Sequence, residues 1–248
     1  MTAPARIGLI IPSSNRMVEQ EMVRYVPAGV QGHVARLRMT GPHHIPLDQL
    51  LPRIEDATRT LNDAKCDVVA FHCTATSMEE GMAGEERVLA ALRRAGAVRA
   101  LTTATAIRRA LDVLRARRIV LVTPYSAKTT AEEAEFLRSA GYEVIHAIGF
   151  DLGGSDAFCA TAADFWRERV IEAEREEADV YFLSCANISA FGVIEAIERR
   201  LGRPLITSNQ AVLWDALCQL NWRERAGCPG RLFQMPAAAE PAPMVQHA

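Results

Sequence analysis

The chain has 248 residues, 49% of them hydrophobic and 23% charged, and 28 Lys and Arg against 30 Asp and Glu give a net charge of −2. This composition is that of a globular protein, so it excludes a mainly disordered chain. It carries no basic excess for binding nucleic acid, and no apolar run reaches the ~20 residues of a membrane span. The first residues lack a signal-peptide layout, and we expect a cytoplasmic protein whose six cysteines are free thiols.

Short apolar runs alternate with longer amphipathic segments along the chain. The runs predict strands at 7–11, 68–71, 119–122 and 180–183 that are buried on both faces. The amphipathic segments predict helices at 54–64, 85–95, 104–114, 131–140, 163–177 and 193–201, with Gly141 and Gly202 as helix ends. Strands that alternate with helices in this way indicate an α/β fold with parallel sheets.

The chain contains an internal repeat. Residues 6–14 reappear at 118–126 and residues 67–73 at 179–185, with an offset of 112 in both blocks, and 101–105 resembles 205–209 more loosely. We therefore expect two similar, pseudo-symmetric lobes with the active site in the cleft between them. The N-terminal lobe is predicted to comprise 1–105 with 213–234, and the C-terminal lobe 106–212. The Ala- and Pro-rich residues 235–248 are predicted to form a disordered tail.

Small hydroxyl and amide side chains follow all four predicted strands, in residues 12–15, 73–77, 124–126 and 185–189. Ligands of parallel α/β sheets bind beyond the carboxyl ends of the strands. Each segment precedes a predicted helix, whose first N–H groups attract anions. Because the chain lacks the Gly-rich loops of nucleotide sites, and Gly153-Gly154-Ser155 looks like a simple turn, a small carboxylate is the expected ligand.

Cys73 and Cys185 occupy the same position in the two repeats. Facing lobes would place their thiols on opposite sides of one cleft, and a helix N-terminus would lower the pKa of each thiol. Such a pair can move a proton across a planar carbon, or one thiol can attack while the other handles the proton. The alternative is that both are small buried hydrophobic residues. Cys66, Cys159, Cys218 and Cys228 have no repeat partner and are expected in the core or at the surface. The sequence contains no Cys-x-x-Cys pair, so its cysteines do not indicate a metal site.

Five other residues have both a functional and a structural interpretation. His72 adjoins Cys73 in a strand, so its side chain is predicted to point away from the site. The pair His43-His44 forms either a lid or a solvated loop. Tyr125 either donates to a carboxylate or packs as an aromatic residue. Asn15 either caps a helix, binds a carboxylate, or does both.

Together, Pro12-Ser13-Ser14-Asn15, the Cys73 block, Pro124-Tyr125 and the Cys185 block resemble the aspartate/glutamate racemase superfamily. They are most similar to its maleate cis–trans isomerase and arylmalonate decarboxylase branch, from about residue 5 to about residue 220. The resemblance implies two Rossmann-like lobes and catalysis on a small carboxylate without a cofactor or a metal. It also implies a homodimer or higher homo-oligomer.

The resemblance also implies roles for individual residues. Cys73 matches the nucleophile of maleate isomerases, and Cys185 matches the cysteine that donates and accepts the proton. The candidate substrate-binding residues are Ser14, Asn15, Thr74, Tyr125, Ala186 and Asn187. Arylmalonate decarboxylases carry glycine where Cys73 stands, so Cys73 argues against that activity.

Two residues depart from the isomerase pattern. Residues 152–156 offer no asparagine for a second carboxylate, and Asp156 would repel one. Arg16 replaces a small hydroxyl residue, where it either contacts a carboxylate or points to solvent. Maleate-to-fumarate isomerisation is the first hypothesis. The alternatives are an amino-acid or hydantoin racemase, an arylmalonate-type decarboxylase, and a carboxylate-binding protein without turnover.

Overall fold

In a computed structural model of the protein, residues 4–39, 45–225 and 227–236 are described. The His43-His44 pair and residues 237–248 of the predicted disordered tail lie outside them. Within the described part of the chain, no helix is both long and apolar enough to cross a membrane.

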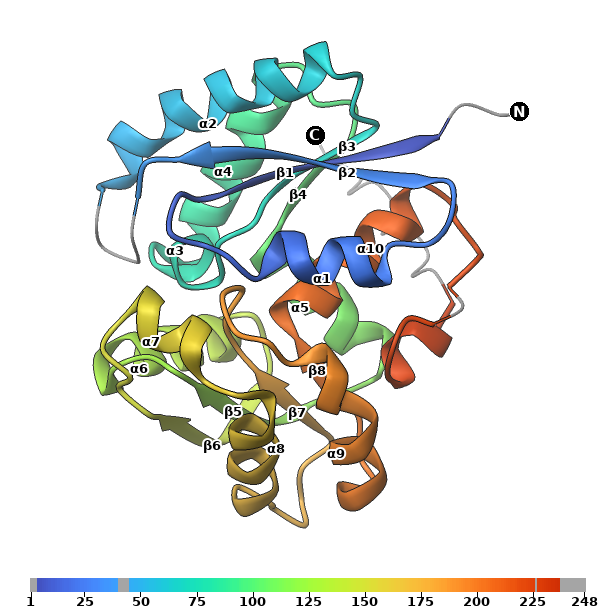
Figure 1. Ribbon diagram of the computed structural model, residues 1–248. Coiled ribbons are helices and arrows are strands. Elements are labelled where there is room, and N and C mark those ends of the chain that lie inside the picture. The colour runs from blue at the N-terminus through green and yellow to red at the C-terminus, as the bar shows by residue number, and fades with distance from the viewer. Residues whose placement is uncertain (1–3, 40–44, 226, 237–248) are drawn as a thin grey trace, which may run out of the picture.

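The chain forms two four-stranded parallel sheets, which confirms the predicted two-lobe α/β fold (Figure 1). The first has the order β2-β1-β3-β4, and its strands are β1 (Ala5–Pro12), β2 (Val30–Leu37), β3 (Val68–Phe71) and β4 (Ala100–Thr102). The second has the equivalent order β6-β5-β7-β8, formed by β5 (Arg118–Thr123), β6 (Glu143–Gly149), β7 (Val180–Leu183) and β8 (Leu205–Thr207).

The offset of 112 persists in the register and in the side-chain contacts. Ile7 pairs with Val68 in the first sheet, as Ile119 pairs with Val180 in the second. Asp67 accepts a hydrogen bond from the Arg6 amide at 2.8 Å, and the equivalent Asp179 accepts one from the Arg118 amide at 2.8 Å. The repeat is therefore one structural unit used twice.

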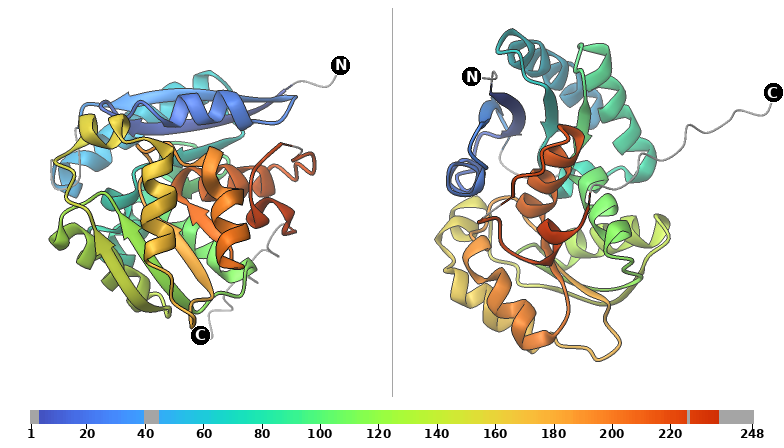
Figure 2. Two further views of the ribbon diagram at one scale, coloured as in Figure 1. Left: turned by 60° about the horizontal axis from the view of Figure 1, so that its bottom comes forward. Right: turned by 90° about the vertical axis from the view of Figure 1, so that its right-hand side faces the viewer.

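Helices connect the strands and cover the sheets. Their bounds are α1 (Val18–Tyr25), α2 (Leu47–Asp63), α3 (Thr74–Met78), α4 (Gly81–Arg94), α5 (Thr103–Val113), α6 (Ala127–Ser139), α7 (Ser155–Ala160), α8 (Ala163–Glu172), α9 (Ile194–Leu201) and α10 (Ser208–Gln219). The predicted helix at 163–177 ends at Glu172, because the chain turns back toward β7 and the Arg175 amide donates to the Tyr181 hydroxyl at 2.9 Å. A 3₁₀ helix (Arg231–Gln234) follows α10 and packs against it (Figure 2).

Helices α5 and α10 pack against each other and join the two halves of the molecule. Each begins after the last strand of its sheet and is capped by a threonine hydroxyl. Thr102 accepts from the Thr105 amide at 3.0 Å, and Thr207 accepts from the Gln210 amide at 3.1 Å. The lobe boundaries that we propose, 105/106 and 212/213, fall within these two helices.

The α5–α10 contact contains a buried ion pair. The Asp215 side chain is 3% exposed, and Arg109 Nη1 lies 3.0 Å from each of its carboxylate oxygens. Removing the guanidinium leaves a buried carboxylate without its counter-charge, which is costly.

We expect Arg109→Ala to lower the free energy of unfolding by about 2 kcal/mol, because the Arg109 side chain is itself partly exposed and water can partly replace it. Urea unfolding at pH 7 measures the change. Arg199→Ala serves as the control: its 3.8 Å pair with Glu195 is exposed, and its loss should change stability by less than about 0.5 kcal/mol. Equal losses in the two variants would contradict the role given to the buried pair.

Candidate active site

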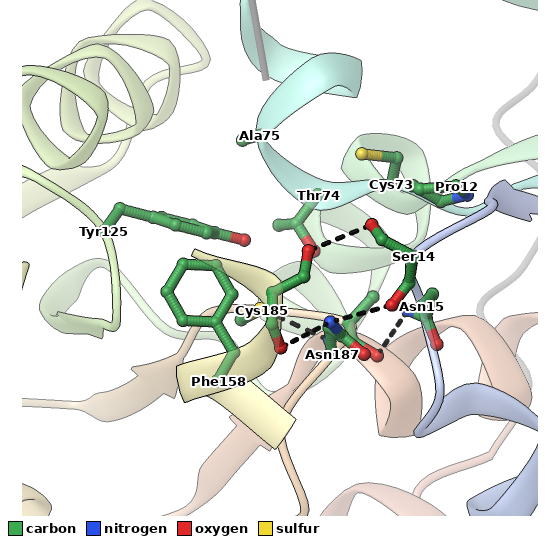
Figure 3. Close-up of a pocket in the computed structure, with 12 residues that line it drawn as sticks. Pro12, Ser14, Asn15, Cys73, Thr74, Ala75, Tyr125, Phe158, Cys185 and Asn187 are labelled. Carbon is green, nitrogen blue, oxygen red and sulfur yellow. Dashed lines mark hydrogen bonds between the residues drawn. The ribbon is translucent and has the colours of Figure 1, made fainter. Parts of the chain in front are cut away.

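A pocket lies where the carboxyl ends of the two sheets face each other (Figure 3). Its cavity volume is about 40 Å³, whereas a single water needs about 10–15 Å³, so it suits a small molecule. Segments from both lobes line it: Pro12, Ser14, Asn15, Cys73, Thr74, Ala75, Tyr125, Ser155, Phe158, Cys185, Ala186 and Asn187. The structure thus brings together all eight residues that the sequence analysis proposed for the site.

Cys73 enters the pocket from the N-terminal lobe, at the residue that precedes α3. Its Sγ donates to the Thr76 hydroxyl at 3.2 Å. Burial raises the pKa of the Cys73 thiol, and the hydrogen bonds that the Thr76 hydroxyl and amide can give to an ionised sulfur only partly oppose that effect. The resting residue is therefore a thiol.

Cys185 enters from the C-terminal lobe, two residues after β7. The Asn187 amide donates to its Sγ at 3.3 Å, and the Tyr125 hydroxyl also hydrogen-bonds to it. Burial raises the pKa of the Cys185 thiol to about 12 despite these two donors. At neutral pH this thiol keeps its proton.

The expected lowering of both thiol pKa values was wrong for a physical reason. The sequence analysis placed a helix after each cysteine, but Cys185 is followed by an irregular turn and a 3₁₀ helix (Phe191–Val193). Helix α3 after Cys73 is only five residues long. Desolvation of the buried sulfur therefore outweighs the local dipoles.

Ser208, at the start of α10, links the segments that carry the two cysteines. Its hydroxyl oxygen accepts from the Thr74 hydroxyl at 2.8 Å and from the Cys185 amide at 3.2 Å. Thr74 follows Cys73 directly, so one oxygen positions both thiol-bearing segments. The sequence analysis did not select Ser208, although the loose match of 101–105 with 205–209 pointed to this stretch.

Asn15 joins the lobes across the floor of the pocket. Its Oδ1 accepts from the amides of Met17 and Val18 at 3.0 and 3.1 Å, which caps the start of α1 as the sequence predicted. Its Nδ2 donates to the Ala186 carbonyl in the other lobe at 2.9 Å. Since this nitrogen carries two hydrogens, one remains for a ligand.

Asn187 makes the reciprocal connection. Its Oδ1 accepts from the Arg16 amide at 2.8 Å and from the Cys159 thiol at 3.0 Å. Cys159, expected in the core or at the surface, thus lies beside the pocket wall on α7. No repeat partner marked this position.

Helix α7 closes the pocket and contributes two lining residues that the sequence analysis missed, Ser155 and Phe158. The Ser155 hydroxyl donates to the Ser14 hydroxyl at 2.9 Å, across the lobes. The Phe158 ring packs edge-on against Tyr125, with ring centres 5.7 Å apart. Gly153 and Gly154 lie outside regular structure, but Ser155, expected in the same simple turn, begins α7, and its position in the pocket has no sequence signature.

Arg16 and Asp156 do not face the cavity. They pair with each other at 2.7 Å on the outer side of α7, and the Asp156 side chain is 98% exposed. The predicted repulsion between Asp156 and a bound carboxylate is therefore absent, because solvent and the guanidinium screen that charge.

His72 points away from the pocket, as its place in the strand predicted. Its Nδ1 lies 2.9 Å from the Thr103 hydroxyl and its Nε2 lies 2.8 Å from Asn209 Oδ1. Burial lowers the pKa of the imidazole to about 4, so His72 is neutral at pH 7. It supports the strand end from behind and does not touch the ligand space.

In the described parts of the chain, no group of three or more His, Cys, Asp or Glu side chains is placed to hold a metal ion. What the pocket offers instead is two protonated thiols and several hydroxyl and amide groups.

Comparison with known proteins places the chain in a family. A family model for arylmalonate decarboxylase matches residues 7–233. A maleate isomerase from Geobacillus stearothermophilus is 28% identical, over 92% of this chain and 96% of that protein. An arylmalonate decarboxylase from Bordetella bronchiseptica is 27% identical, over 85% of this chain and 88% of that protein.

Solved structures show the same fold. A cysteine-to-serine mutant of the Nocardia farcinica maleate cis–trans isomerase, with a covalently bound succinylcysteine intermediate, superimposes with a TM-score of 0.82. It is 25% identical and covers 92% of this chain and 98% of its own. An unliganded arylmalonate decarboxylase has a TM-score of 0.82 and 26% identity over 93% and 99% of the two chains.

The buried His72 makes stability depend on pH. The unfolded imidazole titrates near pH ~6.5, so between pH 6.5 and 4 the unfolded chain binds more protons than the folded one. Stability is therefore complete above pH 6.5 and falls toward pH 4, by about 2 kcal/mol at pH 5. Urea unfolding at pH 7 and pH 5 measures this loss.

His72→Gln is the matched variant, since its amide still reaches Asn209 but does not titrate. We expect this variant to be less stable than the wild type at pH 7 and to show about 2 kcal/mol less pH dependence. If both proteins lose the same free energy between pH 7 and pH 5, His72 is not the titrating group.

Proposed function

The chain belongs to the arylmalonate decarboxylase family, and we propose that it is a cofactor-independent isomerase that converts maleate into fumarate through Cys73 and Cys185. The observation that carries this proposal is the pair of thiols, one from each lobe, in one small pocket. Relatives named maleate isomerase support the substrate, and the succinylcysteine in the Nocardia farcinica structure supports a covalent route.

The reaction that the pair supports is an addition followed by an elimination. The Cys73 thiolate adds to one carbon of the double bond, and the Cys185 thiol gives its proton to the other carbon. The former double bond is now single and rotates. The Cys185 thiolate then removes a proton from the same carbon, the bond to Cys73 breaks, and fumarate leaves with both cysteines restored.

Burial raises the pKa of both thiols, so each has to lose its proton at a different stage of the proposed reaction. Because the pKa of Cys185 is about 12, this thiol is fully protonated at neutral pH and suits the proton donor. The Tyr125 hydroxyl beside it stabilises the thiolate formed after the donation. Cys73 has to ionise before it attacks, so turnover should increase with pH as more thiolate forms.

The remaining lining residues suit the carboxylates. Ser14 offers a hydroxyl, Asn15 and Asn187 offer amides, and Ala186 belongs to the same lining. The Thr74 hydroxyl, which donates to Ser208, has to turn toward the ligand to take part. We propose that these five groups bind one carboxylate where the lobes meet. The cavity volume of about 40 Å³ favours a four-carbon acid over a bulkier one.

One observation favours a second candidate, decarboxylation of an arylmalonate-type acid. Phe158, the Tyr125 ring, Ala75 and Pro12 make part of the wall apolar, which suits a nonpolar substituent in place of a second carboxylate. That reaction needs one thiol to protonate the product, and Cys185 is placed for it. Cys73 would then have no role.

We also propose that the protein works in the cytoplasm as a homodimer or higher homo-oligomer, with a small carboxylate as its substrate and no nucleic-acid partner. The near-neutral charge and the family resemblance support this proposal. Light scattering after size-exclusion chromatography measures the assembly.

Proton NMR of maleate in D₂O with the reduced protein tests the function. We expect fumarate to appear, Cys73→Ser to lower its rate by at least about 10³-fold, and Cys185→Ser to lower it comparably, because each thiol takes part in a bond-making step. The rate should rise between pH 6 and pH 8.

Cys218→Ser is the matched control, since Cys218 lies outside the pocket and should leave turnover unchanged. Absence of fumarate with the wild type would remove maleate as the substrate. Carbon dioxide release from a substituted malonate that survives Cys73→Ser but not Cys185→Ser would establish the decarboxylase instead.

A further inference from the structure

The repeat relates a second pair of residues behind the two cysteines. Glu21 on α1 and Glu133 on α6 differ by the same offset of 112 that relates Cys73 to Cys185. Both side chains are buried, with residue exposures of 7% and 1%. Each is connected to the residue that precedes the cysteine of its lobe: Glu133 contacts Ser184 directly, and Glu21 reaches His72 through Asn209.

The two carboxyl groups have different hydrogen-bond environments. Glu21 has donors at both oxygens, since Oε1 accepts from the Ala190 and Phe191 amides at 3.0 and 3.2 Å and Oε2 accepts from Asn209 Nδ2 at 2.7 Å. These are N–H donors, which suit a carboxylate. Glu21 therefore acts as an acceptor that ties α1 to the segment after Cys185.

Glu133 has a single donor. The Ser184 hydroxyl donates to its Oε2 at 2.7 Å, while its Oε1 is fully buried and has no hydrogen-bond partner. A buried oxygen with a full charge and no donor would be costly, so this environment favours the neutral acid. Burial correspondingly raises the pKa of Glu133 to about 8.

Among the residues that the structure describes, no counter-ion on the neighbouring elements changes this conclusion. Glu132 on the same helix raises the pKa of Glu133 further. On α4, which packs against α6, the charged side chains pair elsewhere: Glu85 with Arg108, Arg87 with Glu80 and Asp48, Arg93 with Glu86, and Arg94 with Glu55. On β6, Glu143 is exposed to solvent and His146 contacts Arg175. Glu79, which follows α3, is acidic and so is not a counter-ion for Glu133. On the pocket side, the titratable neighbours are Cys73, Tyr125 and Cys185 themselves.

We propose that Glu133 is a positioning residue for Cys185 that works in its protonated form. Its carboxyl group holds Ser184, and with it the start of the segment that carries Cys185, without placing a negative charge behind the two thiols. When Glu133 ionises, its charge opposes thiolate formation at both cysteines. The consequence for turnover rests on the proposed function, whereas the effect on the thiols does not.

The charge on Glu133 acts on the same three groups that the reaction uses. An ionised Glu133 raises the pKa of Cys73, of Tyr125 and of Cys185. Thiolate should therefore increase with pH more slowly above pH 8, where Glu133 loses its proton, than below it. One unit of thiol pKa corresponds to about a tenfold change in thiolate.

The test is the rate of alkylation of Cys185 and Cys73 by iodoacetamide from pH 6 to pH 10, read by peptide mass spectrometry, in the wild type and in Glu133→Gln. The amide still accepts from Ser184 but never ionises. We expect equal rates within about twofold at pH 6, and about three- to tenfold faster alkylation of the variant at pH 9.5. A ratio that stays constant with pH would overturn the proposal.

Two further variants keep the test decisive. Glu135→Gln makes the same change on the exposed side of α6, where Glu135 is 74% exposed, and its pH profile should match the wild type.

Ser184→Ala removes the donor that lowers the pKa of Glu133, so the change of slope should move to higher pH. This variant decides the matter if Glu133→Gln does not fold, and an unmoved change of slope would count against Glu133.

The maleate assay separates this inference from the proposed function. A Glu133-dependent alkylation profile without fumarate formation would remove the proposed substrate and retain the role of Glu133. Fumarate formation with identical alkylation profiles in wild type and Glu133→Gln would do the reverse.

Discussion

The pocket depends on hydrogen bonds that cross between the two lobes. Asn15 illustrates the constraint, since one amide caps α1 in its own lobe and donates to the Ala186 carbonyl in the other. Ser208 similarly accepts from Thr74 and from the Cys185 amide. Because these bonds are buried, opening the lobes would leave polar groups without partners, and that cost keeps the two thiols at one small cavity.

Burial has a second consequence, because it decides the ionisation of the site. It raises the pKa of both thiols and of Glu133, and lowers that of His72, so each of these groups is held in its neutral form at rest. A neutral site of this kind takes up an anionic substrate without opposing it by charge. In the proposed reaction, the proton that Cys185 keeps is the one given to the carbon skeleton of the substrate.

Patterns within short segments allowed much of the fold to be predicted, and their limits explain what was missed. The apolar runs at 68–71 and 180–183 coincide with β3 and β7, which are buried throughout. By contrast, all four outer strands were missed: β2 and β6 because they are partly exposed and carry mixed side chains, and β4 and β8 because each has only three residues. The helix expected after Cys185 begins only at Ile194, because the residues directly after the cysteine form a turn that is held by tertiary contacts such as that of Glu21 with the Ala190 amide.

The sequence by itself determined the repeat, and therefore the two lobes, the parallel sheets and the equivalence of Cys73 and Cys185. These follow from local apolar patterns and from a constant offset, both of which are recorded along the chain. Only the tertiary structure decided how the thiols are protonated, that Phe158 and Ser155 line the pocket, and that Glu133 lies behind Cys185 with an unpartnered oxygen. The physical reason is that desolvation and contacts between lobes depend on distances in space, which no spacing in the sequence specifies.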